Sequence, residues 1–453
     1  PRWRSWSRNV SRHSRFTEAD AMNLALSEEQ TMIRDSAADV LAERSASAAV
    51  RQAIEHTAGR DEALWRTLAG ELGWCALTVP EAAGGAGLGA MELVLLMEQM
   101  GRRLACVPYF STVCLAATAL AQCESAAARV WLSRIAGGEV SATLALDAAG
   151  GFNTRKASAY AVPGFDTRSV TIYAEETAYG YRLSGALAQV IDGASADLVL
   201  VPAWIANESQ TIALFELNCA GLAGLSRTPL TTLDATRPLA RVELNVVDVP
   251  RDALLACGDE AQRALARTVW FAALALAAEQ LGGAQQCLDL TLAYTAERVQ
   301  FGRAIASFQA IKHRCAQMMV EIEATRSAVL GAAQAWDQAW DPGRNEARDQ
   351  AAVSLPKQAL ADIAAAKATA NDAFRFCAQE AIQLHGGVGF TWEYDPQLYF
   401  KRAQACSAQF GTTAQMLSFI AEHVIDRSEA SSATRPLPPA HADHVQAVLA
   451  GVL

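Results

Sequence analysis

Glu297-Arg298-Val299-Gln300-Phe301-Gly302 separates two long helical patterns in the second half of this 453-residue chain. The motif continues with Ile305, Phe308-Gln309 and Ile311-Lys312-His313. Two further motifs are Leu72-Gly73-Trp74 through Pro80-Glu81 to Gly84-Gly85, and Gln383-Leu384-His385-Gly386-Gly387-Val388-Gly389-Phe390-Thr391 with Glu393. One glycine-rich turn would be weak evidence for any protein family, but three motifs in this order are strong evidence for one.

The regions between these motifs differ in hydrophobic periodicity. From about residue 27 to 138 apolar residues recur at helical spacing, and Ser27 with Gln30 predicts a capping box at the first helix. From about residue 140 to 250 the pattern changes to short runs that predict antiparallel strands, with a turn at Asp192-Gly193. These runs are 170–173, 198–201, 212–215 and 241–244. Helices return from about 259 to 425 and include an apolar stripe through Cys315, Met319 and Ile322.

The predicted fold class is therefore α+β with several domains. We expect an N-terminal helical domain at 22–138, a middle antiparallel β-barrel or sandwich domain at 139–254, and a C-terminal helical bundle at 255–427. Residues 1–21 are rich in arginine and serine and are interpreted as a leader, either an organellar transit peptide or sequence upstream of Met22. Residues 428–453 are interpreted as a loosely held tail.

The composition argues against several classes of function. A net charge of −10 argues against a nucleic-acid partner, because phosphate binding needs a basic face. The uncharged run at 104–123 is diluted by polar residues and small alanines, so it predicts a buried helix rather than a membrane span. Ten cysteines without a Cys-x-x-Cys pair indicate reduced thiols rather than metal ligands. They favour a bacterial cytoplasm over a mitochondrion.

Over roughly Ser27 to Arg427 the chain resembles the acyl-CoA dehydrogenase family, and the three motifs carry the resemblance. In such enzymes FAD lies across a subunit boundary, where one subunit surrounds the flavin ring and its neighbour holds the pyrophosphate and adenosine. The resemblance implies that this chain holds a neighbour's FAD through Arg298, Phe301, Gln309, Gln383, Gly386 and Gly387, and Thr412 is a further residue expected to bind the cofactor. Arginine bonds phosphate oxygens with charge assistance, and glycine lets the backbone approach a cofactor closely. Phe301 is equally suited to an ordinary core position.

The half of the site that would surround the chain's own flavin ring departs from the family pattern. Family members have a Thr-Glu-Pro-x-x-Gly-Ser-Asp-like stretch, which is absent from the corresponding residues 143–151. The later Trp-Ile-Thr-Asn-Gly signature reads Gln189-Val190-Ile191-Asp192-Gly193 here. The ring pocket implied by the resemblance is therefore incomplete.

The catalytic base implied by the resemblance is also missing. These enzymes use a positioned carboxylate to remove the α-proton of an acyl-CoA thioester. Phe410 stands where most members have glutamate, and Ala272 stands at the family's alternative position, 26 residues before Arg298. Glu279 lies on nearly the same helix face as Ala272 but about 10 Å along the axis. It is a candidate substitute base, although a solvated or interface charge is the simpler interpretation.

These losses favour a base-lacking subunit of a heteromeric acyl-CoA dehydrogenase that desaturates an acyl-CoA between its α and β carbons. A second dehydrogenase-like subunit would supply the base, and an electron-transfer flavoprotein would accept the electrons. Paired chains of this kind often act in β-oxidation of bulky acids such as steroid side chains. Three alternatives stay open, because fold does not determine function. They are a homo-oligomeric dehydrogenase with another base, a flavin monooxygenase or nitroalkane-oxidase-like enzyme, and a non-catalytic scaffold.

Overall fold

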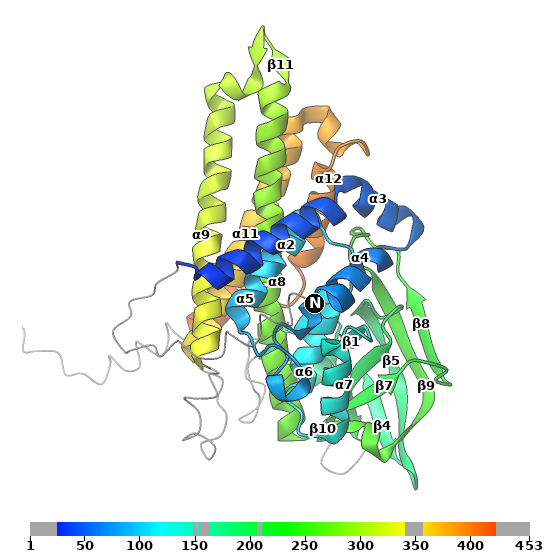
Figure 1. Ribbon diagram of the computed structural model, residues 1–453. Helices are drawn as coiled ribbons and strands as arrows, with labels where there is room; N and C mark the ends of the chain where they lie inside the picture. Colours follow the sequence, from blue (N-terminus) through cyan, green and yellow to red (C-terminus); the bar gives the residue numbers. More distant parts are fainter. Residues whose placement is uncertain are drawn as a thin grey trace, which may run out of the picture.

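The computed structural model describes residues 25–147, 152–153, 164–165, 167–205, 211–339 and 357–422. This part of the chain forms N-terminal helices, a central sheet and a C-terminal group of long helices (Figure 1). The predicted α+β fold class is confirmed. The predicted leader at 1–21 and tail at 428–453 lie outside the described residues, as do residues 148–151 of the stretch expected near the flavin ring.

The N-terminal region is helical, as its periodicity predicts. Its α-helices are α2 (Glu28–Arg44), α3 (Ser47–His56), α4 (Glu62–Arg66), α5 (Ala90–Arg103), α6 (Thr118–Leu120) and α7 (Ala126–Ala136). They are joined by the π-helices η1 (Thr67–Glu71) and η4 (Phe110–Ala117) and by the 3-10 helices η2 (Trp74–Ala76) and η3 (Glu81–Ala83). The capping box at α2 is confirmed, because Ser27 Oγ accepts from Gln30 N–H and Gln30 Oε1 accepts from Ser27 N–H. The uncharged run at 104–123 forms the buried η4 and α6.

The central region is one mixed sheet with two small additions. Its strands are β1 (Ala142–Leu144), β4 (Ile172–Glu176), β5 (Gly180–Ile191), β6 (Leu198–Ile205), β7 (Thr211–Asn218), β8 (Leu225–Pro229), β9 (Leu239–Pro250) and β10 (Leu254–Cys257). The small pieces are β2 (Phe152–Asn153), β3 (Gly164–Phe165), η5 (Thr167–Ser169) and η6 (Arg251–Ala253). The order is β10-β7-β6-β4-β5-β9-β8, with β1 beside β6.

The strand predictions at 198–201, 212–215 and 241–244 fall inside β6, β7 and β9, while the run at 170–173 begins two residues before β4. The sheet is not purely antiparallel, because β1 and β4 both pair with β6 in parallel. Among the described residues these strands are hydrogen-bonded in one path from β10 to β8. Alternating residues indicate which face of a strand is buried, and they carry no information on the direction of the neighbouring strand.

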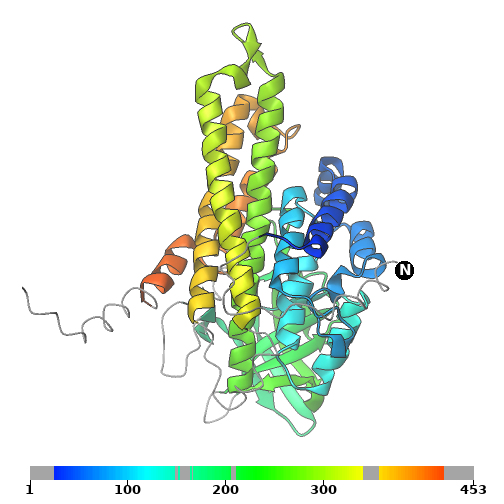
Figure 2. The ribbon, with the colours of Figure 1, turned by 60° about the vertical axis from the view of Figure 1, so that its left-hand side comes forward.

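Three long helices dominate the C-terminal region and run side by side (Figures 1 and 2). They are α8 (Asp259–Glu297), α9 (Gln309–Ala339) and α11 (Lys357–His385), and the shorter elements are β11 (Val299–Gln300), β12 (Arg303–Ala304), η7 (Ile305–Ser307), η8 (Gly386–Phe390), α12 (Pro396–Cys406) and α13 (Thr413–Ile420). Cys315 and Ile322 of the predicted stripe are buried, but Met319 is 46% exposed. The prediction that Met319 lies on the buried face of this helix was therefore wrong.

Helix α8 is the centre of the core. By length and composition it could cross a membrane, yet 94% of its most apolar window is buried inside the protein. It packs closely on α5 because both helices have glycine at the contact. A Cβ on Gly101 would lie 1.9 Å from the backbone oxygen of Glu279, and a Cβ on Gly282 would lie 1.8 Å from that of Glu98. This close approach fixes Glu279 between the N-terminal and C-terminal helices.

Candidate functional site

Six of the seven residues predicted to bind a cofactor lie at one end of the long helices. Helix α8 ends, α9 begins and α11 ends at this place, and the ring of Tyr294 stacks on His385 with centroids 4.3 Å apart. Tyr294 also accepts a hydrogen bond from Arg298 N–H, so the stack brings Arg298 near Gly386. All six residues are exposed: Arg298, Phe301, Gln309, Gln383, Gly386 and Gly387.

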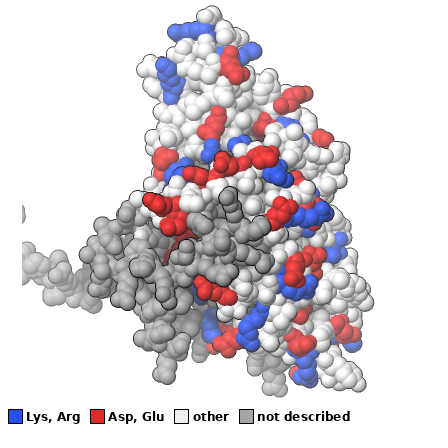
Figure 3. Space-filling model, in the orientation of Figure 1, with Lys and Arg blue, Asp and Glu red and all other residues white. Residues whose placement is uncertain are grey.

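The motif around Arg298 forms a small hairpin of β11 and β12 that projects beyond the helices (Figure 1). Its tip residue Phe301 has a positive φ of 54° and is 90% exposed. The interpretation of Phe301 as a core residue is therefore wrong. The guanidinium of Arg303 lies 4.1 Å from the ring centre of Phe308, and Figure 3 shows Lys and Arg side chains gathered at this end. The hairpin thus presents both apolar and cationic surface to solvent.

Two of the three glycines of the third motif, Gly386 and Gly387, leave open space beside the backbone. A Cβ on Gly386 or Gly387 would meet no described atom within 4 Å, and Gly386 has a φ of 66°. An exposed guanidinium at Arg298, amides at Gln309 and Gln383, and open peptide groups fit the pyrophosphate and adenosine of a dinucleotide. The residues present therefore fit the polar half of FAD.

Thr412 does not lie with the other six residues. It caps α13, and the loop before it is held by Asn371 Nδ2, which donates to Gly411 O at 3.2 Å. Asn371 precedes His385 by 14 residues on α11, which corresponds to about 21 Å along a helix.

The two positions expected to carry a base are closed. Phe410 is buried with a φ of 51°, and its ring lies 5.6 Å from that of Phe110. Ala272 is also buried within α8. Neither side chain can accept a proton. Lys367 contacts the segment just before Phe410. Its Nζ donates to Cys406 O at 3.3 Å and to Asn371 Oδ1 at 2.5 Å.

Lys367 is expected to make stability depend on pH. Burial lowers its pKa from 10.5 to about 7. Between these values the unfolded chain binds one more proton than the folded chain, so this group favours the folded state increasingly as the pH rises through that range. Unfolding midpoints of the wild type and Lys367→Met should therefore diverge, with the wild type gaining stability relative to the variant above about pH 7. A difference that is constant with pH would contradict the lowered pKa.

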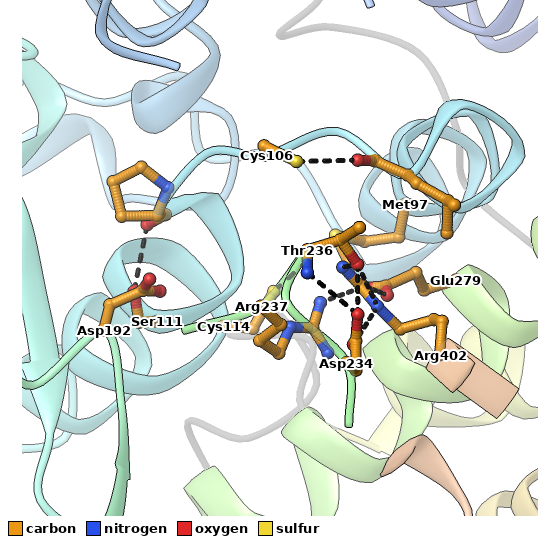
Figure 4. A network of polar contacts seen from close by, with 12 residues as sticks. Met97, Cys106, Ser111, Cys114, Asp192, Asp234, Thr236, Arg237, Glu279 and Arg402 are labelled. Carbon is orange, nitrogen blue, oxygen red and sulfur yellow. Dashed lines mark hydrogen bonds and ion pairs between the residues drawn. The ribbon is translucent and has the colours of Figure 1, made fainter. Parts of the chain in front are cut away.

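Glu279 lies in a buried ion cluster (Figure 4). Its two carboxylate oxygens accept hydrogen bonds from Arg237 Nη2 and Arg402 Nη1. Arg402 Nε also pairs with Asp234 Oδ2 at 2.7 Å, and Thr236 Oγ1 accepts from Arg402 Nε at 3.0 Å. The cluster joins α8, α12 and the connection between β8 and β9. The expectation of a solvated or interface charge at Glu279 was wrong, because the residue is 4% exposed.

The cluster makes Glu279 a poor base. Burial alone would raise the pKa of Glu279, but Arg237 and Arg402 together hold it below its usual value. Among the described residues Arg237 Nη1 has no hydrogen-bond partner, although the guanidinium lies 4.6 Å from the ring centre of Phe110. The cavity beside it measures about 10 Å³ and is lined by these charges with Met97 and Met100. That space holds about one water molecule.

The turn that replaces the Trp-Ile-Thr-Asn-Gly signature is also buried. Asp192 has a φ of 53°, and its Oδ2 accepts a hydrogen bond from Ser111 Oγ at 2.6 Å (Figure 4). Burial raises the pKa of Asp192, and the bond from Ser111 opposes this shift. Thr143 Oγ1 donates to Ile191 O at 2.7 Å. The Asp192 carboxylate and the Ile191 carbonyl are therefore satisfied by hydrogen bonds within the protein.

Sequence reasoning missed Arg237, Arg402 and Asp234. None lies in the three motifs, and their partners are distant along the chain: Arg237 is 42 residues from Glu279, and Arg402 is 123 residues from it. An isolated arginine in a region of mixed polarity carries no signal of burial. The residues that close the site could therefore be found only from the structure.

Comparison with known proteins identifies the family. The N-terminal domain model of acyl-CoA dehydrogenases matches residues 27–139, and the C-terminal domain model matches residues 263–425. Acyl-CoA dehydrogenase IpdE2 of Mycobacterium tuberculosis is 32% identical over 382 residues, which cover 84% of this chain and 92% of that protein. IpdE2 of Mycolicibacterium smegmatis is 32% identical over 395 residues, or 86% of this chain and 97% of that protein.

Two solved structures show the same fold in complexes named for two different chains. The ChsE4-ChsE5 complex from Mycobacterium tuberculosis superposes with a TM-score of 0.72 at 28% identity, covering 92% of this chain and 100% of the matched chain. The Tcur3481-Tcur3483 steroid ACAD superposes with a TM-score of 0.69 at 29% identity, covering 89% and 99%. Together with the three motifs and the fold, these matches show that the chain belongs to the acyl-CoA dehydrogenase family of oxidoreductases.

Proposed function

We propose that this chain is the base-lacking subunit of a heteromeric acyl-CoA dehydrogenase and completes the FAD site of an unlike partner. One observation carries the proposal: the residues that would serve a neighbour's FAD are exposed, whereas the positions that would serve the chain's own reaction are buried. Arg298, Gly386 and Gly387 belong to the exposed group. Phe410 and Ala272 are buried and apolar.

Arg298, at the end of α8, is also far along that helix from the candidate base Glu279. Arg298 follows Glu279 by 19 residues, which is about 28 Å along α8. A carboxylate must lie within hydrogen-bond reach of the proton that it removes. Glu279 is buried and paired with Arg237 and Arg402, so its carboxylate is already engaged by two arginines. This arrangement disfavours a homo-oligomeric dehydrogenase that uses Glu279 as its base.

The chemistry is divided between the subunits in this proposal. FAD supplies the hydride acceptor, and a carboxylate of the partner removes the α-proton. Arg298 of this chain balances the charge of the pyrophosphate, while Gln309 and Gln383 bind polar edges of the cofactor. Because one relative of similar fold is named a steroid ACAD, the CoA thioester of a steroid-derived acid is the proposed substrate class. An electron-transfer flavoprotein as acceptor and the bacterial cytoplasm as location belong to the same proposal.

Flavin content of the purified protein tests this function. Expressed alone, the chain should purify without flavin colour and without dehydrogenase activity. In this proposal it supplies only the residues that bind the pyrophosphate and adenosine of FAD. Co-expressed with a dehydrogenase-like chain that retains the glutamate, it should yield a yellow complex with one FAD per pair of unlike chains. Flavin absorbance and subunit mass give this ratio directly. A lone chain that binds one FAD per protomer and oxidises an acyl-CoA would refute the proposal.

A further inference from the structure

Helix α3 of the N-terminal region contacts the loop that follows the exposed glycines. Ser47, Arg51 and Glu55 are spaced four residues apart, so they lie along one face of α3. Each of the three contacts the loop 391–395, which connects η8 to α12. These partners are separated by more than 300 residues in the sequence, so the contact exists only in the folded protein.

Arg51 is the centre of this contact. Its Nη1 donates to the backbone oxygen of Trp392, and its Nη2 donates to Asp395 Oδ1 at 2.5 Å. Asp395 Oδ1 also accepts from Ser47 Oγ at 2.6 Å. The indole N–H of Trp392 donates to Glu55 Oε1 at 3.2 Å, and the guanidinium of Arg51 lies 5.0 Å from the Trp392 ring centre. One arginine therefore holds both ends of the loop.

The opposite side of the loop contacts the end of α8. The ring of Tyr394 meets Tyr294 edge-on at 5.9 Å and His385 at 6.1 Å. The backbone oxygen of Tyr294 accepts a hydrogen bond from Arg298 N–H, and His385 directly precedes Gly386. The loop thus lies between α3 and the aromatic stack that brings Arg298 and the glycines together. A shift of the loop would change the spacing between these groups.

The loop buries little side-chain surface of its own, although Thr391 Oγ1 donates to Val388 O at 3.0 Å and Lys401 Nζ lies 5.7 Å from the Trp392 ring centre. Phe390, Trp392 and Tyr394 are among the exposed large apolar side chains of the described residues. Gly386 and Gly387 are exposed too. A segment with so little buried surface depends on its few polar contacts for a defined conformation. The hydrogen bonds that join the loop to α3 come from Ser47, Arg51 and Glu55.

We propose that Arg51 is a positioning residue for the cofactor of the partner subunit. It holds loop 391–395 so that Gly386 and Gly387 keep their distance from Arg298 and bind the pyrophosphate and adenosine of FAD as one preformed surface. The inference rests on the proposed function, because it assumes that this exposed end binds FAD. Arg51 acts through the loop and does not touch the cofactor.

The test uses the co-expressed complex, from which FAD is removed and then titrated back. Arg51→Ala should weaken FAD affinity about tenfold, because a charge-assisted contact that holds the binding surface is lost. Arg51→Lys should restore part of it, since lysine reaches Asp395 but lacks the second donor of the fork. At saturating FAD, kcat and the KM for acyl-CoA should equal those of the wild type. Arg44→Ala, at an exposed arginine of α2, should leave FAD affinity unchanged.

Arg298→Ala separates the two possible failures. It should weaken FAD affinity about tenfold to a hundredfold, because it removes a direct contact with the pyrophosphate. If Arg298→Ala weakens binding and Arg51→Ala does not, the positioning inference is wrong. If neither variant changes affinity, the proposed function fails instead. Should Arg51→Ala not fold, Asp395→Asn removes the same ion pair with little change in volume, and wild-type FAD affinity in that variant would overturn the inference.

Discussion

Glu279→Ala is expected to destabilise the chain by about 3–5 kcal/mol, since it leaves two buried guanidinium groups without a counter-charge. Arg237 and Arg402 both donate to Glu279, and all three side chains are buried. The measurement is the urea midpoint of the complex at neutral pH. Because Arg237 and Arg402 hold the pKa of Glu279 below its usual value, the stabilisation is present above the pKa of an unfolded-chain glutamate and is lost as the pH falls through the lowered pKa of the folded state.

Two control variants separate the charge of Glu279 from its volume and from ion pairing in general. Glu279→Gln keeps the shape and one acceptor but removes the charge, so it should still lower the midpoint substantially. Asp248→Ala breaks the exposed pair with Arg182, whose atoms are 2.8 Å apart, and should leave the midpoint nearly unchanged. If Glu279→Ala behaves like Asp248→Ala, the cluster does not hold α8, α12 and the β8–β9 connection together.

The second large effect is kinetic. In the complex, replacing the partner's catalytic glutamate with glutamine should lower kcat about 10²- to 10⁴-fold, the usual contribution of a positioned acid or base. Phe410→Leu in this chain should leave kcat unchanged, because a buried phenyl ring against Phe110 performs no proton transfer. Stopped-flow reduction of the flavin by acyl-CoA measures the chemical step directly.

The two variant complexes must contain equal amounts of FAD, so that a fall in activity cannot be caused by loss of the cofactor. The leucine keeps an apolar side chain of similar size, which limits any packing defect at Phe410. A loss of kcat in Phe410→Leu with full FAD occupancy would mean that this chain's own site takes part in the reaction. The heteromeric proposal would then have to be abandoned in favour of a site within this subunit.

Much of the fold could be predicted because its signals repeat locally. The capping box of Ser27 and Gln30 involves residues three apart, and it formed as predicted. The runs that became β6, β7 and β9 alternate with the period of a strand, while α8, α9 and α11 follow the period of a helix. Such patterns depend on a residue and its near neighbours, so they can be read without knowing the rest of the structure.

The family of the chain could also be predicted from its sequence. Three motifs, including the one at Arg298 and the one at Gly386-Gly387, occur in the family's order, and the comparisons agree. The absence of glutamate at Phe410 and Ala272 follows from residue identity alone. What remained undetermined was the environment of each residue. Glu279 was expected to be solvated and is buried, while Phe301 could have been core and is exposed.

Contacts between distant residues account for this difference. Arg402 lies 123 residues from Glu279, and Arg51 lies 344 residues from Asp395. The parallel pairing of β1 and β4 with β6 is likewise invisible in the alternation of each strand. No periodic pattern links such partners, because a side chain's hydrophobicity and spacing describe its own element alone. Its ion pairs, its burial and its access to substrate depend on which elements the completed fold brings beside it.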